Sequence, residues 1–218
     1  MKNLFKYAAE HWKSLVAIIV ILFIQAYCDL SLPAYTSDIV NVGIQQGGVE
    51  DQIPKAISAD EMEKLLLFVP EKSQSVVLDA YTEDDSTYET QAYILKDSLS
   101  ESEKKTEELG EILQGPMMLA SGFESGSDMT KQIEEQLKAN MPAQAGVEDM
   151  TIFDLLKMLP AEQRETMIQS MEEQMEDMPD TILEQASVAY VKSAYQELGM
   201  DMDNIQIHYL LVTGGKMV

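Results

Sequence analysis

KSLVAIIVILFIQAYCDLSLPAYTSDIVNVGIQQGG, residues 13–48, is the stretch that decides the fold. Residues 15–24 are an unbroken apolar run, and with residues 25–32 they reach the length of one membrane crossing. A hydrocarbon core about 30 Å thick requires about 20 helical residues, which fits a span from Ser14 to about Pro33. The sequence therefore predicts one transmembrane helix near the N-terminus.

The residues before this span form an amphipathic pattern. Apolar Leu4, Phe5, Ala8 and Trp12 share one helical face, and Lys2, Lys6 and Lys13 share the other. This pattern is typical of a cytoplasmic interfacial helix over residues 1–13. A signal peptide begins similarly, but signal peptidase requires small residues after the apolar run, and a lipoprotein requires a small residue directly before its cysteine. A bulky Tyr27 stands directly before Cys28, so we expect the segment to be retained.

The helix is predicted to continue beyond the membrane. Pro33 has no amide N–H, so the carbonyl of Asp29 loses its usual helical partner and we expect a kink there. Apolar residues continue as far as Ile44, and Gly47-Gly48 is a helix-ending signal. We therefore assign residues 14–48 to the transmembrane helix and its extracellular extension.

Charge is distributed unevenly along the chain. The formal net charge is −23, but residues 1–32 carry +1 and the remainder carries −24. Lysines before the span and almost none just after it place the N-terminus in the cytoplasm and residues 49–207 outside the cell. Such acidity repels nucleic acid, which we exclude as a partner. Cys28 is the only cysteine, so the outer segment must be held together without an internal disulfide.

Residues 49–207 carry repeated helix-start signals. Three pairs have capping-box spacing: Ser58 with Glu61, Ser100 with Glu103, and Thr181 with Glu184. Thr151 is expected to open a helix that Pro160 ends, and Gly199 to close the last helix. The signals predict a mostly helical acidic extracellular domain, and 15 methionines with only 7% aromatic residues favour helices over a sheet sandwich.

Other parts of this segment are expected to be irregular or extended. Gly115-Pro116 and residues 121–128 have the composition of flexible connections. Residues 75–81 and 88–95 are able to pair as short strands, so the mainly α fold can include a small β element. Residues 208–218 turn apolar again but are too short to cross a bilayer, and we interpret them as the start of the return into a second transmembrane helix.

Residues 25–48, with the run DIVNVGI at 38–44, resemble the first transmembrane helix of ABC-type exporter subunits, in which permease and ATPase are fused in one chain. Residues 1–12 look like the elbow helix of these proteins. Some members, often heterodimeric multidrug exporters, carry a large extracellular insertion between helices one and two. The resemblance implies that residues 49–207 are this insertion and that the sequence is the N-terminal fragment of a subunit that exports a hydrophobic or peptide-like compound.

The resemblance also implies partners and cofactors: membrane lipid, the remaining transmembrane helices, a second exporter subunit, and ATP with Mg in a nucleotide-binding domain. The 218 residues contain no G-x-x-x-x-G-K-[S/T] phosphate loop, because Gly214-Gly215-Lys216 is followed by Met217 and lacks the upstream glycine. His11 and His208 belong to no catalytic motif. We therefore assign no catalytic, cofactor-binding or metal-binding residue to this chain.

Gln25, Asp29 and Thr36 are the candidate functional residues. They are four and seven residues apart, hence on one helical face within about 40°. An ionisable residue inside a span is a functional candidate, because placing it at the bilayer centre costs about 2.5–3.5 kcal/mol. We predict that this face lines the translocation cavity of a helix bundle. In the alternative interpretation Asp29, about 22 Å along a core of about 30 Å, lies near the outer interface and is solvated.

Two clusters within residues 161–178 have both a functional and a structural interpretation. Ile168, Met171, Met175 and Met178 recur at helical spacing, which can give an adaptable binding surface but here is predicted to be core. Four acids, Glu172, Glu173, Glu176 and Asp177, are expected to face water rather than to hold calcium.

Two alternatives to an exporter subunit stay open. The chain could be a single-pass membrane-anchored extracellular binding module whose work is done by residues 49–207, or a non-functional truncated product. The module would fold and function without other helices, whereas a truncated product would leave no stable protein in cells. Five more apolar spans and a phosphate loop downstream of Val218 would identify the exporter.

Overall fold

The computed structural model describes residues 12–216 except 101, 127, 141–149 and 176–177. The chain divides into two compact units: unit 1 contains Met1–Gly48 and Asp203–Val218, and unit 2 contains Val49–Met202. Of the predicted interfacial helix over residues 1–13, only Trp12 and Lys13 lie within the described residues, where they begin the long helix of unit 1. Glu176 and Asp177 also lie outside the described residues.

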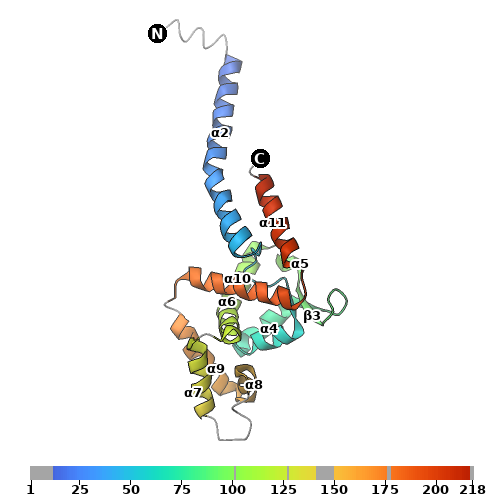
Figure 1. Cartoon of the computed structure of the whole chain (residues 1–218), viewed down its shortest axis with the longest axis vertical. Helices are drawn as coiled ribbons and strands as arrows, with labels where there is room; N and C mark the ends of the chain where they lie inside the picture. The colour runs from blue at the N-terminus through green and yellow to red at the C-terminus, as the bar shows by residue number, and fades with distance from the viewer. Residues whose placement is uncertain (1–11, 101, 127, 141–149, 176–177, 217–218) are drawn as a thin grey trace. The chain divides into compact units, whose positions relative to one another are not determined.

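Unit 1 is built from three helical segments (Figure 1): α2 spans Trp12–Asp38, η1 spans Ile39–Gln45 and α11 spans Met202–Lys216. Pro33 lies inside α2, and η1 follows without a break as a π-helix. Gly47 and Gly48 end the segment with φ angles of 69° and 81°. The predicted continuation past Pro33 and the end at these two glycines are confirmed.

The long helix of unit 1 has the length and composition of a membrane span. Its most apolar window has a mean hydropathy of 2.3, and none of that window is buried. Trp12–Gln45 is the one helix among the described residues that is long and apolar enough to cross a bilayer. The first part of the chain is therefore suited to anchoring in a membrane.

Unit 2 is mainly helical, as predicted. Its helices are α3 (Ala59–Leu66), α4 (Glu71–Ala80), α5 (Asp97–Ser100), α6 (Glu103–Ser125), α7 (Asp128–Asn140), α8 (Ile152–Met158), α9 (Ala161–Met175) and α10 (Asp180–Glu197). Its strands are β1 (Ala56–Ser58), β2 (Tyr81–Asp84) and β3 (Ala92–Leu95). The small β element is therefore present.

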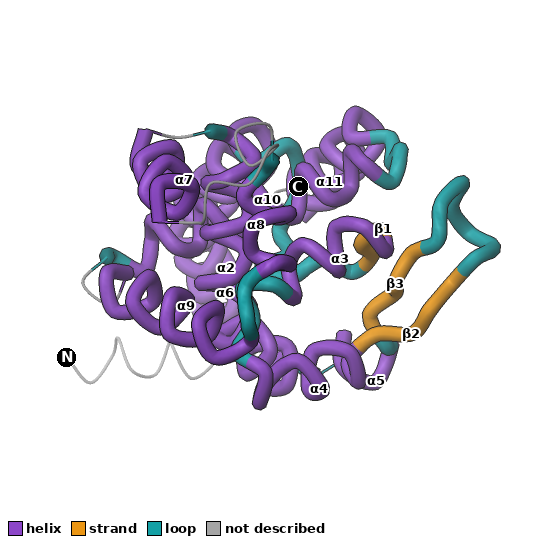
Figure 2. Tube along the Cα trace, turned by 90° about the horizontal axis from the view of Figure 1, so that it is seen from below, coloured by secondary structure: helices purple, strands orange, loops and turns teal. Residues whose placement is uncertain are grey.

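The strands form one antiparallel sheet in the order β1-β3-β2, with Ile57 opposite Tyr93 and Thr82 opposite Ile94. β2 and β3 run together to the loop that joins them (Figure 2). The predicted second strand over residues 88–95 contains β3. The predicted first strand over 75–81 is wrong except at Tyr81, because residues 71–80 form α4 after Pro70 and the strand begins where the helix ends.

Two of the predicted helix starts have the expected cap and two do not. Ser58 accepts the N–H of Glu61 at 3.2 Å, and Thr151 forms a complete capping box with Asp154. Ser100 is wrong as a cap, because it ends the short α5 and α6 begins after Ser102. Thr181 is also wrong as a cap, because α10 begins at Asp180, after Pro179, although the predicted helix itself is present and ends before Gly199, whose φ is 72°.

The predicted flexible connections at Gly115-Pro116 and residues 121–128 are wrong for most of their length. Both stretches lie inside α6 as far as Ser125, and Gly126 ends that helix with a φ of 62°. A proline removes one backbone hydrogen bond from a helix, but packing along both flanks compensates for that loss. α6 packs against α10 and α3 in the interior of unit 2, which keeps it continuous through Pro116.

The core of unit 2 is centred on the contact between α6 and α10. Leu113 and Met117 of α6 and Tyr190 and Val191 of α10 are completely buried. The predicted methionine stripe is confirmed as core: Ile168, Met171 and Met175 are buried, and Met178 is half-buried.

Candidate functional site: an uncovered apolar helix, its paired helix and a buried carboxylate cluster

The three predicted site residues lie on α2. Gln25, Asp29 and Thr36 are all exposed on this one helix. The hydroxyl of Thr36 donates to the carbonyl of Leu32 at 2.8 Å, so it is satisfied within its own helix. The side chains of Gln25 and Asp29 share a face by their spacing, and what this face meets stays a prediction.

The apolar window of α2 is open to its surroundings. Phe23 is 74% exposed, Ile21 62% and Leu30 80%, although side chains of this size are usually buried in a soluble protein. A continuous surface of this kind marks a membrane or protein interaction site.

α11 contacts η1 and the glycine turn that follows it. A Cβ at Gly43 would lie 2.5 Å from Cδ2 of Leu210, so the missing side chain makes room for that leucine. The amide of Gln206 donates to the carbonyl of Gly43 at 2.8 Å. Gly48 meets the backbone of α11, because a Cβ there would lie 2.7 Å from Cα of Gln206. Glycines 43 and 48 therefore form a seat for α11, which we call the glycine seat.

The contacts at the glycine seat set the direction of α11. Its later residue, Leu210, meets the earlier glycine, so α11 runs antiparallel to η1, as Figure 1 also shows. α11 has 15 residues, about 22 Å of helix, and Ile207 and Leu211 on it are 55% and 71% exposed. Unit 1 is thus the junction of two antiparallel helices, and all of unit 2 lies between them in the sequence.

The two ends of unit 2 meet within that unit. The hydroxyl of Tyr195, near the end of α10, accepts the N–H of Lys55 at 3.0 Å and donates to Oδ2 of Asp51 at 3.1 Å. Leu198 packs on Ala56 and Ala92 in a small buried cluster. A domain whose entry and exit are adjacent can be inserted between two neighbouring elements without separating them.

A carboxylate cluster lies inside unit 2. Glu61 of α3 is 2% exposed, and its carboxylate pairs with Lys64 on the same helix. Lys64 also pairs with Glu124 of α6 at 3.3 Å, and the hydroxyl of Tyr190 lies 3.5 Å from Glu61. The cluster therefore links three helices: Lys64 joins α3 to α6, and Glu61 joins α3 to Tyr190 of α10.

Burial and charge shift the titration of this cluster. Burial raises the pKa of Glu124, and the charge of Glu61 raises it further against the opposing effect of Lys64. Burial likewise raises the pKa of Glu197, with the charge of Glu61 as the next cause. Burial lowers the pKa of Lys64, but its bonds to Glu61 and Glu124 outweigh burial and raise it overall. Burial holds the pKa of Tyr190 well above its ordinary value.

These shifts predict that unit 2 becomes more stable as the pH is lowered from about 7 to about 5. A carboxyl group with a raised pKa holds its proton more tightly when folded. Its contribution is therefore complete below the unfolded value and is lost as the pH rises through the folded value. The lowered pKa values of Asp84 and Asp154 act in the opposite direction only below about pH 4. The melting temperature of the full chain at the two pH values measures the effect.

Two double variants that each remove two negative charges separate the effect of this cluster from that of net charge. Glu124→Gln with Glu197→Gln should flatten the dependence on pH, whereas Asp85→Asn with Glu89→Gln, in the exposed loop between β2 and β3, should preserve it. An equal slope for the two double variants would assign the pH effect to overall charge repulsion and contradict the prediction.

No protein-family model, curated protein or solved structure matches this chain. Among the described residues, no group of three His, Cys, Asp or Glu side chains is arranged to hold a metal ion. The geometry of the chain itself is therefore what carries a functional proposal.

Sequence reasoning missed the glycine seat and the carboxylate cluster. Gly47-Gly48 was recognised only as the end of a helix. The contacts of Gly43 and Gly48 with α11 could not be predicted, because they join residues more than 150 positions apart in the sequence. Glu61 was recognised only as part of a capping box, and its burial follows from α10, which supplies Tyr190.

Proposed function

We propose that this chain is the first membrane helix and the extracellular insertion of an ABC-type exporter subunit. In this assignment α2 crosses the bilayer from a cytoplasmic N-terminus, and unit 2 lies outside the cell. α11 begins the return toward a second transmembrane helix. ATP and Mg act in a nucleotide-binding domain elsewhere in the complete subunit, which pairs with a second subunit.

The observation that carries this proposal is the return of α11 to the glycine seat. An anchored module needs one helix and a domain, and nothing in that plan calls for a second apolar helix. Here Leu210 and Gln206 contact Gly43, and exposed apolar side chains continue along α11. Two antiparallel helices with a domain inserted between them are the arrangement that a large first extracellular insertion requires.

The role of α2 is that of one wall element in a helix bundle. Its fully exposed apolar window supplies surface for lipid and for neighbouring helices. The polar face of Gln25, Asp29 and Thr36 would turn toward the translocation cavity, because polar side chains inside a membrane face the bundle interior or water. In alternating access this helix would move with its bundle as a rigid body.

Cysteine labelling tests the orientation. Cys28→Ser removes the only cysteine, and Glu89→Cys then places a single thiol in the exposed loop between β2 and β3. Intact cells treated with a membrane-impermeant maleimide should label Glu89→Cys, whereas Asn3→Cys should label only after the cells are permeabilised. The reverse pattern would place unit 2 in the cytosol and overturn the proposal.

The size and activity of the native polypeptide test the exporter assignment separately. An antibody raised against unit 2 should detect an integral membrane protein longer than 218 residues, and the immunopurified protein should hydrolyse ATP. A stable membrane protein of 218 residues with unit 2 outside would instead identify the single-pass binding module. Absence of any stable product would identify a truncated reading frame.

A further inference from the structure

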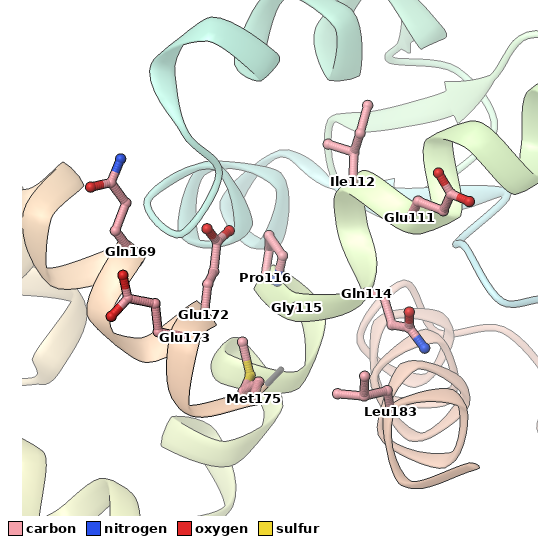
Figure 3. Close-up of a pocket in the computed structure, with 10 residues that line it drawn as sticks. All are labelled: Glu111, Ile112, Gln114, Gly115, Pro116, Gln169, Glu172, Glu173, Met175 and Leu183. Carbon is pink, nitrogen blue, oxygen red and sulfur yellow. The ribbon is translucent and has the colours of Figure 1, made fainter. Parts of the chain in front are cut away.

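A groove on unit 2 is formed by three helices that are distant in the sequence. It has a volume of about 430 Å³ and is bordered by α6, α9 and the start of α10. Figure 3 shows the side chains of α9 on one side, those of α6 on the other, and Leu183 of α10 at one end. A volume of this size lies within the range of ligand sites, about 300–1,000 Å³.

The rim of this groove is acidic. Glu111 of α6 and Glu172 and Glu173 of α9 line it, and none of its lining residues is basic. Across the described residues, no ion pair involves any of these three carboxylates. Their charge is therefore available to a ligand, and the whole chain, with 38 acidic and 15 basic residues, adds an attractive field for a cation.

The floor of the groove is apolar and adaptable. Met175 is 7% exposed and packs onto Gly115, where an added Cβ would lie 3.3 Å from its Cε. Pro116 is buried beside it, and Leu183 is half-buried. The thioether side chain of methionine adjusts to varied apolar shapes. This floor gives an apolar side chain a surface on which to be buried.

Pro116 also adds a backbone acceptor. Proline has no N–H, so the carbonyl of Ile112, four residues earlier, lacks the donor that an uninterrupted helix would provide. Both residues line the groove, together with the amide side chains of Gln114 and Gln169. A ligand that carries N–H donors, such as a peptide backbone or a lysine side chain, finds neutral acceptors here beside the carboxylates.

We propose that this groove binds a cationic amphipathic peptide segment. Its basic side chains pair with Glu111, Glu172 and Glu173, and its apolar side chains lie on Met175, Leu183 and Pro116. A bare divalent cation would make no use of the apolar floor, and the described residues hold no cluster arranged for a metal. The inference depends on unit 2 alone, and it stands whether or not α2 belongs to an exporter.

The test uses the full chain in nanodiscs of neutral phosphatidylcholine, with empty nanodiscs as background. The probe is a short fluorescein-labelled peptide of alternating lysine and leucine, read by fluorescence anisotropy. Glu111→Gln, Glu172→Gln and Glu173→Gln together should weaken binding about tenfold, because three partly screened ion pairs are lost. The matched control of equal charge change, Asp85→Asn, Glu89→Gln and Asp97→Asn, should bind as the unmodified chain does.

Leu183→Ser tests the floor independently of charge. It should weaken binding of the lysine–leucine peptide at least threefold and leave binding of a lysine–serine peptide unchanged. Equal weakening by the two triple variants would assign binding to diffuse attraction by net charge and overturn the proposal. Equal binding of a glutamate–leucine peptide, or of the lysine–serine peptide, would also overturn it. Unchanged melting temperatures show that the variants are folded.

Discussion

Phe68→Ala is expected to destabilise unit 2 by about 3–5 kcal/mol, the largest single loss that a side chain in this unit should cause. Phe68 is completely buried in the turn that follows α3. Its ring stacks on Phe123 with centroids 5.6 Å apart and meets Phe153 edge-on at 6.0 Å. Truncation to alanine therefore removes one ring from two aromatic pairs and leaves a cavity between α6 and α8.

Hydrogen exchange of the full chain, followed by mass spectrometry of peptides from 49–202, measures this loss. Amides of α3, α6 and α8 should exchange much faster in Phe68→Ala, because opening of the core becomes less costly. Val76→Ala is the matched control: Val76 on α4 is 51% exposed, so its truncation should change stability by no more than about 0.5 kcal/mol. Equal protection in the two variants would show that the aromatic cluster is not the centre of the core.

Local signals in the sequence were sufficient for several elements. The apolar run that begins at Leu15 predicted α2, and Gly47-Gly48 predicted the end of η1, which continues it, because both signals depend on neighbouring residues only. The Thr151 cap belongs to the same class, since Asp154, the residue that completes it, lies three positions away. Membrane length, backbone conformation and capping are properties of a short window, and a single sequence contains them.

Two kinds of cause explain the elements that were predicted wrongly. Gly115-Pro116 has the composition of a connection, but α10 and α3 pack along α6 and keep it helical. Residues 75–80 combine valine, serine and leucine as a strand would, yet Pro70 starts a helix that ends only at Ala80. For Gly115-Pro116 the energy of packing outweighed the local preference, whereas for residues 75–80 a local helix start at Pro70 was overlooked.

The candidate sites lay beyond sequence reasoning for the same reason. The carboxylate cluster joins Glu61 to Tyr190 across 129 residues, and the acidic groove joins Glu111 to Glu172 and Glu173. In the sequence each of these acids is one of 38, and helical acids usually face water. Only the fold distinguishes the few that are buried or gathered around an apolar floor.

Gly48→Ala is expected to release α11 from η1, with amides of residues 203–216 exchanging at least tenfold faster. Gly48 has a φ of 81°, which a non-glycine residue adopts at a cost of about 1–3 kcal/mol. An added Cβ would also lie 2.7 Å from Cα of Gln206 and 2.9 Å from the carbonyl oxygen of Ile205. Both are backbone atoms, so no rotation of a side chain relieves the clash, and α11 must move. About 1.4 kcal/mol corresponds to a tenfold change, so the conformational cost alone reaches that factor over most of its range.

Gly214→Ala is the matched control, because it makes the same substitution on α11 at a place where an added Cβ meets no atom within 4 Å. Alanine favours a helix over glycine by about 1 kcal/mol, so α11 should exchange more slowly in this variant. Gly48→Asn separates the two causes at the glycine seat, since asparagine tolerates a positive φ but still carries the clashing Cβ. If Gly48→Asn leaves α11 protected, the close approach of Gln206 does not hold the helix. If α11 stays protected in Gly48→Ala as well, α11 does not depend on the glycine seat. The paired-helix arrangement that supports an exporter subunit then loses its basis.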